Sequence, residues 1–154
     1  MRGYYVPLVS GLVLILSTFL PWISLGDSTL RGMPSVPAMW VAGLGAAAVL
    51  LAVLSLITRK NSRHPLLVVG LIALGIMVLS WRVLPRSVGE RALSLSQATA
   101  IVEGTEAEPT PDPLIGSGIY LGAAASALIA LFGLTIVVKR VARPYVVPSQ
   151  DDDV

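Results

Sequence analysis

Four long runs of apolar residues divide the chain, and shorter polar segments separate them. The runs cover about 5–23, 36–58, 65–84 and 115–138. A helix of about 20 residues crosses the roughly 30 Å of bilayer hydrocarbon, and each run is about that long. A lone strand in lipid would leave its backbone hydrogen-bonding groups unpaired, so each run should be a helix. The pattern predicts an all-α membrane protein, a bundle of four transmembrane helices.

The segment between the third and fourth runs carries a weaker helical pattern. Five residues recur there at the spacing of one helix face: Val88, Ala92, Leu95, Thr99 and Val102. This spacing predicts a short amphipathic helix over about 87–102. The acidic, proline-rich stretch 103–113 has nothing to bury and predicts an irregular linker. The acidic residues at 143–154 predict a flexible tail, which leaves 1–142 as one transmembrane domain.

Lysine and arginine placement predicts which way the bundle points. Basic residues near short loops are retained on the cytoplasmic side of the membrane. A cytoplasmic amino terminus puts seven basic residues on that side: Arg2, Arg59, Lys60, Arg63, Lys139, Arg140 and Arg143. It puts four on the outer side: Arg31, Arg82, Arg86 and Arg91. This bias predicts a multi-pass membrane protein with both termini, including the tail, in the cytoplasm.

Composition narrows the chemistry that the chain can carry. The 154 residues are 55% hydrophobic and 13% charged, with no cysteine and one histidine, whereas soluble domains are about 25% charged. Without cysteine there are no disulfides or thiolate metal sites, and His64 has no second histidine with which to form a zinc site. The basic residues flank the apolar runs, so topology explains them better than nucleic acid does. We expect no catalytic residue, cofactor or metal.

Small residues recur on two of the predicted helices. Gly118, Gly122, Ser126 and Ala130 follow one another at every fourth position, and Gly43 and Ala47 have the same spacing. Small side chains on one face let a neighbouring helix approach closely within a membrane. Two interpretations stay open: packing within the bundle, or docking of a larger membrane partner.

Amphipathic side chains lie near the predicted outer boundary of the membrane. Five of them are expected to act as interface anchors, because their apolar bodies suit lipid and their polar tips suit water: Trp22, Trp40, Trp81, Arg82 and Tyr120. Arg82 is also the one charge near hydrocarbon, where it could hold a lipid phosphate or a partner carboxylate.

Two short motifs give the chain a family resemblance. Leu20-Pro21-Trp22 closes the first run, and Gly116-Ser117-Gly118-Ile119-Tyr120-Leu121 opens the fourth. With the glycine-bearing loop between Gly26 and Gly32, these resemble a group of small four-span membrane proteins from actinobacteria. The resemblance implies the four-span topology and no catalytic residues. Because Pro21 and Gly116 lie at the same predicted boundary, the outer ends of the first and fourth helices are expected to lie side by side.

The function most in keeping with this pattern is that of a non-catalytic accessory subunit. Such a subunit would bind and stabilise, or help assemble, a larger inner-membrane complex such as an envelope lipid transporter or a respiratory assembly. The spans contain no Asp, Glu, Lys or His, which pumps and proton relays require. A homo-oligomeric small transporter or pore is the alternative, although few hydroxyl residues are available to line it. A membrane-embedded enzyme is a third possibility, for which Arg82 and His64 are the candidate residues.

Overall fold

The computed structural model describes residues 4–58, 62–107 and 109–141. These residues form four helices and three short strands: α1 (Tyr5–Ser17), β1 (Pro21–Leu25), β2 (Ser28–Arg31), α2 (Val36–Thr58), α3 (Arg63–Glu103), β3 (Pro113–Ile115) and α4 (Ser117–Val141). The predicted basic start at Arg2, the basic turn at 59–61 and the acidic tail at 143–154 lie outside the described residues.

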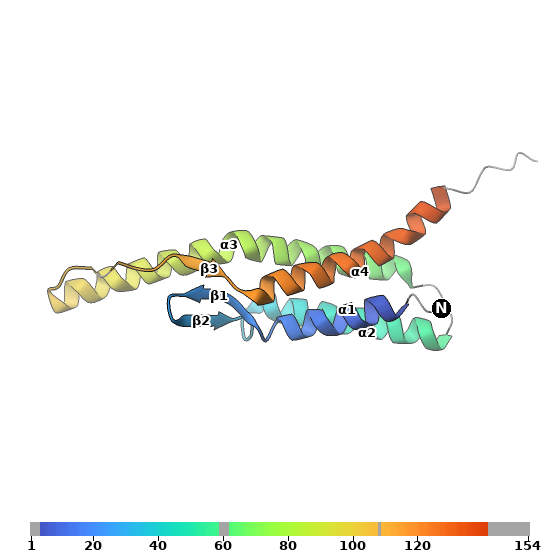
Figure 1. The fold of residues 1–154 in the computed structure, drawn as a ribbon, viewed down its shortest axis with the longest axis horizontal. Helices are drawn as coiled ribbons and strands as arrows, with labels where there is room; N and C mark the ends of the chain where they lie inside the picture. Colours follow the sequence, from blue (N-terminus) through green and yellow to red (C-terminus); the bar gives the residue numbers. More distant parts are fainter. Residues whose placement is uncertain (1–3, 59–61, 108, 142–154) are drawn as a thin grey trace, which may run out of the picture.

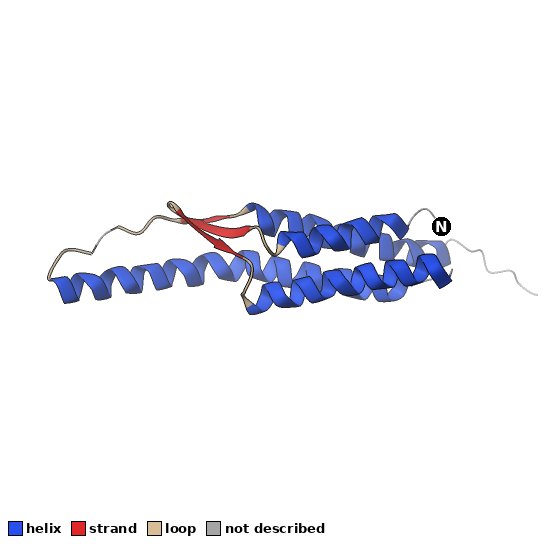
Figure 2. Ribbon diagram, turned by 90° about the horizontal axis from the view of Figure 1, so that it is seen from below, coloured by secondary structure: helices blue, strands red, loops and turns tan. Residues whose placement is uncertain are grey.

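The helices lie side by side along one axis of an elongated molecule (Figure 1). At one end of the bundle, which we call the turn end, α1 begins, α2 ends, α3 begins and α4 ends (Figures 1 and 2). The three strands lie at the opposite end, the sheet end, and α3 continues past them. The arrangement thus places the amino-terminal end and the far end of α4 at the same end of the bundle.

Three of the helices are long and apolar enough to cross a membrane, namely α2, α3 and the described part of α4. The outward-facing side chains of the bundle are also apolar, including exposed Leu16, Leu50, Leu79 and Leu131. Such a surface is typical of a protein covered by lipid rather than by water. The structure therefore indicates a membrane protein.

The prediction of a first transmembrane helix over 5–23 is wrong in its length. α1 has 13 residues and is therefore about 20 Å long, which is short of the hydrocarbon thickness. Pro21 has no amide hydrogen with which to continue the helical ladder, and it disfavours helical backbone at Leu20. The Ser17 carbonyl accepts a hydrogen bond from the Trp22 indole nitrogen instead, at 3.0 Å. The chain leaves the helix there and enters a strand.

A small antiparallel sheet closes the sheet end, so the prediction of an all-α protein is also wrong. The strand order is β2-β1-β3, and Ser24 in the central strand pairs with both Thr29 and Leu114. Gly26, with φ of 56°, makes the turn between β1 and β2, because glycine adopts positive φ without a steric penalty. The strands are only three to five residues long, too short to stand out against the apolar runs beside them.

The third helix runs without a break through two predicted elements. Residues 65–84 and 87–102 were expected as separate helices, yet α3 includes both, with Pro85 inside it. Good helix formers follow the proline, and the Ser87 hydroxyl donates to the Leu84 carbonyl at 3.0 Å. α3 ends at Gly104, which has φ of 66°. Of the predicted linker 103–113, the described residues 104–107 and 109–112 are irregular as expected, while Glu103 ends α3 and Pro113 begins β3.

The core follows the axis of the bundle. Leu14 of α1, Met77 of α3 and Ile129 of α4 are fully buried there, and Trp22 closes the core at the sheet end. At the turn end, the rings of Tyr4 and Phe132 meet edge to face with centroids 5.2 Å apart. These contacts join α1, α3 and α4 into one packed unit.

Candidate functional site

The small residues of α4 pack within the bundle. Gly118, Gly122, Ser126 and Ala130 are all buried. A Cβ added at Gly118 would lie 2.6 Å from the Trp22 Cδ1 atom, and one added at Gly70 of α3 would lie 2.5 Å from the Ala130 nitrogen. Segments α1, β1 and α3 of the same chain therefore pack against this face of α4. The face is not free to receive another protein.

The pair predicted on α2 is placed differently. Gly43 is exposed, and a Cβ added there would meet nothing within 4 Å, while Ala47 is half-buried. The close approach of α2 to α1 is made at Gly45 instead, where a Cβ would lie 3.0 Å from the Gly11 carbonyl oxygen. Gly11 was missed because it stands alone in its apolar run. The sequence indicates this close contact only when Gly11 and Gly45 are considered together as a pair on facing helices.

Trp22 is a core residue rather than an interface anchor. Its side chain is 1% exposed. Glycines from two other segments leave room for the indole ring. A Cβ added at Gly32 would lie 2.5 Å from the indole nitrogen, and one added at Gly118 would lie 2.6 Å from the neighbouring Cδ1 atom. The Gly116 amide donates to the Trp22 carbonyl at 2.7 Å. The two sequence motifs around Trp22 and Gly116 thus meet in space, as expected for neighbouring ends of the first and fourth helices.

The other four predicted anchors lie on the surface near the sheet end. Trp40, Trp81, Arg82 and Tyr120 are all exposed. The rings of Trp81 and Tyr120 meet edge to face with centroids 6.1 Å apart, which links α3 to α4. Trp40 is 66% exposed on α2. These positions suit residues at a membrane boundary.

An open apolar groove lies on the exposed face of α3 and ends at Arg82. It has a volume of ≈ 500 Å³ and is lined by Leu71, Leu74, Gly75, Val78, Leu79 and Arg82. The groove exists because Gly75 has no side chain, and a Cβ built there would meet nothing within 4 Å. A second apolar groove of ≈ 300 Å³ lies on the other side of Leu79, between α3 and the start of α2.

The last part of α3, residues 86–103, begins beside the sheet and ends beyond it, and we call it the α3 arm (Figure 1). Its base lies beside β3, because a Cβ at Gly89 would be 3.6 Å from Pro113. Toward its tip Leu95, Ile101 and Val102 are exposed. Of the predicted stripe on this helix, Val88 and Ala92 are half-buried while Leu95, Thr99 and Val102 face outward.

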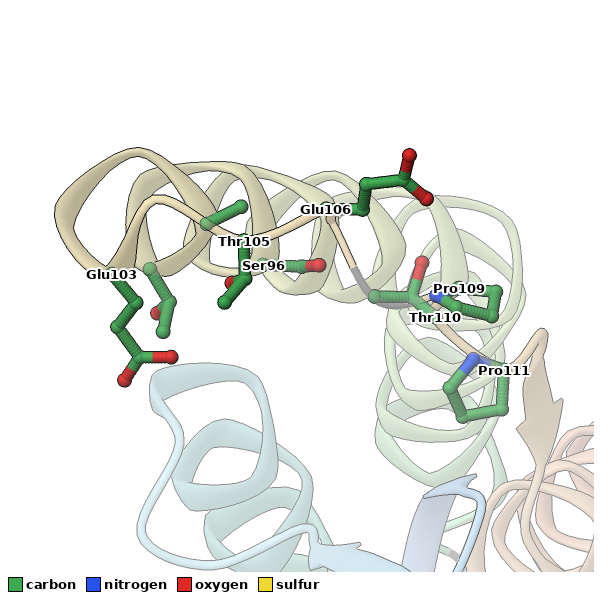
Figure 3. Close-up of a pocket in the computed structure, with 9 residues that line it drawn as sticks. Ser96, Glu103, Thr105, Glu106, Pro109, Thr110 and Pro111 are labelled. Atoms are coloured by element: carbon green, nitrogen blue, oxygen red, sulfur yellow. The ribbon is translucent and has the colours of Figure 1, made fainter.

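The chain that returns from the tip of the arm leaves a cleft of ≈ 430 Å³ against it, lined in part by Ser96, Glu103, Thr105 and Pro111. Figure 3 shows the carboxylates of Glu103 and Glu106 pointing in different directions. Among the described residues, no three His, Asp or Glu side chains come together in a way that could hold a metal ion. The described residues of the cleft therefore offer a surface for contact, and Glu103 and Glu106 do not converge on one point.

These features define a class of structure: a small helical membrane protein whose bundle is closed at one end by a three-stranded sheet and extended there by a helical arm. Comparison with protein-family models, with characterised proteins and with solved structures finds no match to the chain. Among the described residues, the groove on α3 and the exposed tip of the α3 arm are open to contact by a ligand or a partner.

Proposed function

We propose that the protein is a non-catalytic accessory subunit that binds and stabilises, or helps assemble, a larger complex of the bacterial inner membrane. An envelope lipid transporter or a respiratory assembly is a suitable host. In this proposal both termini are cytoplasmic, and the sheet and the α3 arm face outward.

The observation that carries this proposal is the bare apolar tip of the α3 arm. Ile101 is 82% exposed and Val102 is 85% exposed. Val102 follows Arg82 by 20 positions on one continuous helix, so it lies about 30 Å farther along the axis, beyond the reach of the bilayer. Exposed apolar side chains that lie next to one another outside the membrane are typical of protein contact sites.

Two buried hydroxyl groups of the spans favour this function over the alternative of a pore. A conducting path needs polar groups that face water or the permeating ion. Ser17 and Ser126 are buried, and their hydroxyls donate to the carbonyls of Leu14 and Ala123 in their own helices, at 2.7 and 2.9 Å. These side chains are committed to local bonds inside a single packed bundle, which supports a structural role for the spans.

Affinity purification of the tagged full-length chain in a mild detergent tests the proposal. We expect a partner protein to co-purify in a fixed ratio. The double substitution Ile101→Asn with Val102→Asn should lower its recovery by at least about tenfold, because each buried aliphatic side chain contributes about 1.5–3 kcal/mol. Leu114→Asn is the matched control, since Leu114 is also exposed at the sheet end but lies on β3.

The outcomes separate the alternatives. Loss of the partner with the arm substitutions and retention with Leu114→Asn would support the proposal. Recovery of only the chain itself, as a monomer or as a self-associated species, would contradict it. Flux of small solutes through liposomes that contain only this chain would favour the pore.

A further inference from the structure

The groove on α3 has the length of one half of a bilayer. Leu71, Gly75, Val78 and Arg82 follow one another at helical spacing, so the groove runs along the helix instead of around it. Eleven positions separate its ends, which corresponds to about 16 Å at 1.5 Å per residue. One leaflet contributes half of the roughly 30 Å of hydrocarbon, or about 15 Å. An acyl chain of one leaflet therefore fits the groove from end to end.

The charged end of the groove lies where a lipid headgroup would be. Arg82 is exposed and is the one lining residue with a charge. Its long stem can follow apolar surface while the guanidinium reaches the headgroup region. Guanidinium groups bind phosphate through two parallel hydrogen bonds, which are strengthened by charge. Trp40 and Trp81 are exposed at the same end of the bundle, where tryptophan suits the headgroup boundary.

A second groove supplies a place for a second chain. It is lined almost entirely by apolar atoms, from Val36 and Trp40 of α2 and from Ile76, Leu79 and Val83 of α3. Leu79 lines both grooves and forms the ridge between them. Two acyl chains that share one headgroup fit a surface divided in this way.

We propose that this surface binds one phospholipid, with its phosphate on Arg82 and its two acyl chains on either side of Leu79. A transmembrane helix of a partner is a poorer occupant, because it would need an apolar contact along the whole span and would leave the guanidinium without an anion. The proposal is independent of the partner function argued for the α3 arm, which lies farther along α3.

Native mass spectrometry of the purified full-length chain tests this lipid site. The probe is phosphatidylglycerol, compared with diacylglycerol, which has the same chains but no phosphate. We expect one phosphatidylglycerol to be retained per chain. Arg82→Gln should lower its retention by about tenfold or more through loss of the charged hydrogen bonds. Arg91→Gln removes the same charge about 14 Å farther along α3 and should leave retention unchanged.

Gly75→Leu tests the apolar part of the site. The new side chain would enter open space, so the bundle should fold while the groove is filled and lipid retention falls. Ala124→Leu, which adds the same kind of bulk at an exposed position of α4, is the control and should retain lipid.

A readout in liposomes complements these measurements. Phosphatidylglycerol with brominated chains should quench tryptophan emission more than brominated diacylglycerol at the same mole fraction, and Arg82→Gln should remove the difference. The proposal is overturned if diacylglycerol is retained as well as phosphatidylglycerol, or if Arg82→Gln behaves as the unsubstituted chain. Cross-linking from Val78 to a polypeptide in place of lipid would also overturn it.

Discussion

Trp22 illustrates how single residues organise this bundle. Its indole nitrogen bonds the last carbonyl of α1 at Ser17, and its own carbonyl accepts from Gly116. The side chain of this residue thereby fixes the end of α1, and its backbone fixes the start of α4. The sequence indicated that the two motifs share a boundary, but it favoured a surface position for Trp22, because tryptophan near the end of an apolar run most often lies at the headgroups.

Two glycine substitutions should have opposite effects on stability. Gly118→Ala places a methyl group 2.6 Å from Trp22 Cδ1 and 2.7 Å from the Ser17 carbonyl oxygen, and overpacking of this kind costs about 1–3 kcal/mol. Gly43→Ala adds a methyl group in open space and improves helix propensity by up to about 1 kcal/mol. Thermal unfolding in detergent should show a lower Tm for the first and an equal or higher Tm for the second. Equal losses at both positions would contradict the packing described.

The burial of Trp22 can be measured separately from stability. A chain with Trp40→Phe and Trp81→Phe retains Trp22 as its single tryptophan. Since that side chain is 1% exposed, its emission should be blue-shifted and weakly quenched by acrylamide. Red-shifted emission with strong quenching would place Trp22 at a boundary instead, as the sequence alone suggested.

At the scale of elements, the lengths of the apolar runs predicted the bounds of the second and fourth helices well. They predicted the bounds of the first and third helices less well. α2 spans the predicted 36–58, and α4 begins two residues later than predicted. The first helix is shorter because Pro21 removes a donor that the ladder needs. The third is longer because Pro85 does not end it, although proline in a helix interior usually costs about 3 kcal/mol. Propensity alone does not show which of two prolines will interrupt a helix.

The small sheet, which the sequence did not predict, can be tested by cross-linking its strands. Ser24 pairs with Leu114 on one side and with Thr29 on the other. The chain contains no cysteine, so a pair of cysteines can be introduced without competing native thiols. Ser24→Cys with Leu114→Cys should form a disulfide under mild oxidation, because opposed residues of antiparallel strands lie about 4.5–5.5 Å apart.

Thr29→Cys with Leu114→Cys is the control for that cross-link. Those residues lie on the two outer strands, about 10 Å apart across the central strand, and should stay reduced. Cross-linking of both pairs to the same extent would contradict the strand order β2-β1-β3.

The whole molecule consists of a lipid-facing helical bundle and, at the sheet end, the α3 arm that extends beyond it. The sequence predicted the membrane class from 55% hydrophobic residues and the positions of the few charges. The small residues of α4 could not be assigned from sequence, because a close helix contact within a chain and one between chains need the same residue types. In the structure Gly118 and Ala130 are buried by their own chain.

The proposed orientation can be tested by labelling with a membrane-impermeant maleimide. Asp27→Cys and Thr105→Cys, both exposed at the sheet end, should react in intact cells. His64→Cys, exposed at the turn end, should react only after permeabilisation. The reverse pattern would place the termini outside and the α3 arm in the cytoplasm.

Site-specific photocross-linking from position 102 in living cells tests the central proposal most directly. A photoreactive residue in place of Val102 should give one discrete adduct with another membrane protein, since the side chain is 85% exposed and is proposed to contact a partner. The same residue in place of Leu114 should give no such adduct. If position 102 yields only adducts of the chain with itself or no protein adduct at all, the protein is not an accessory subunit that binds through its α3 arm.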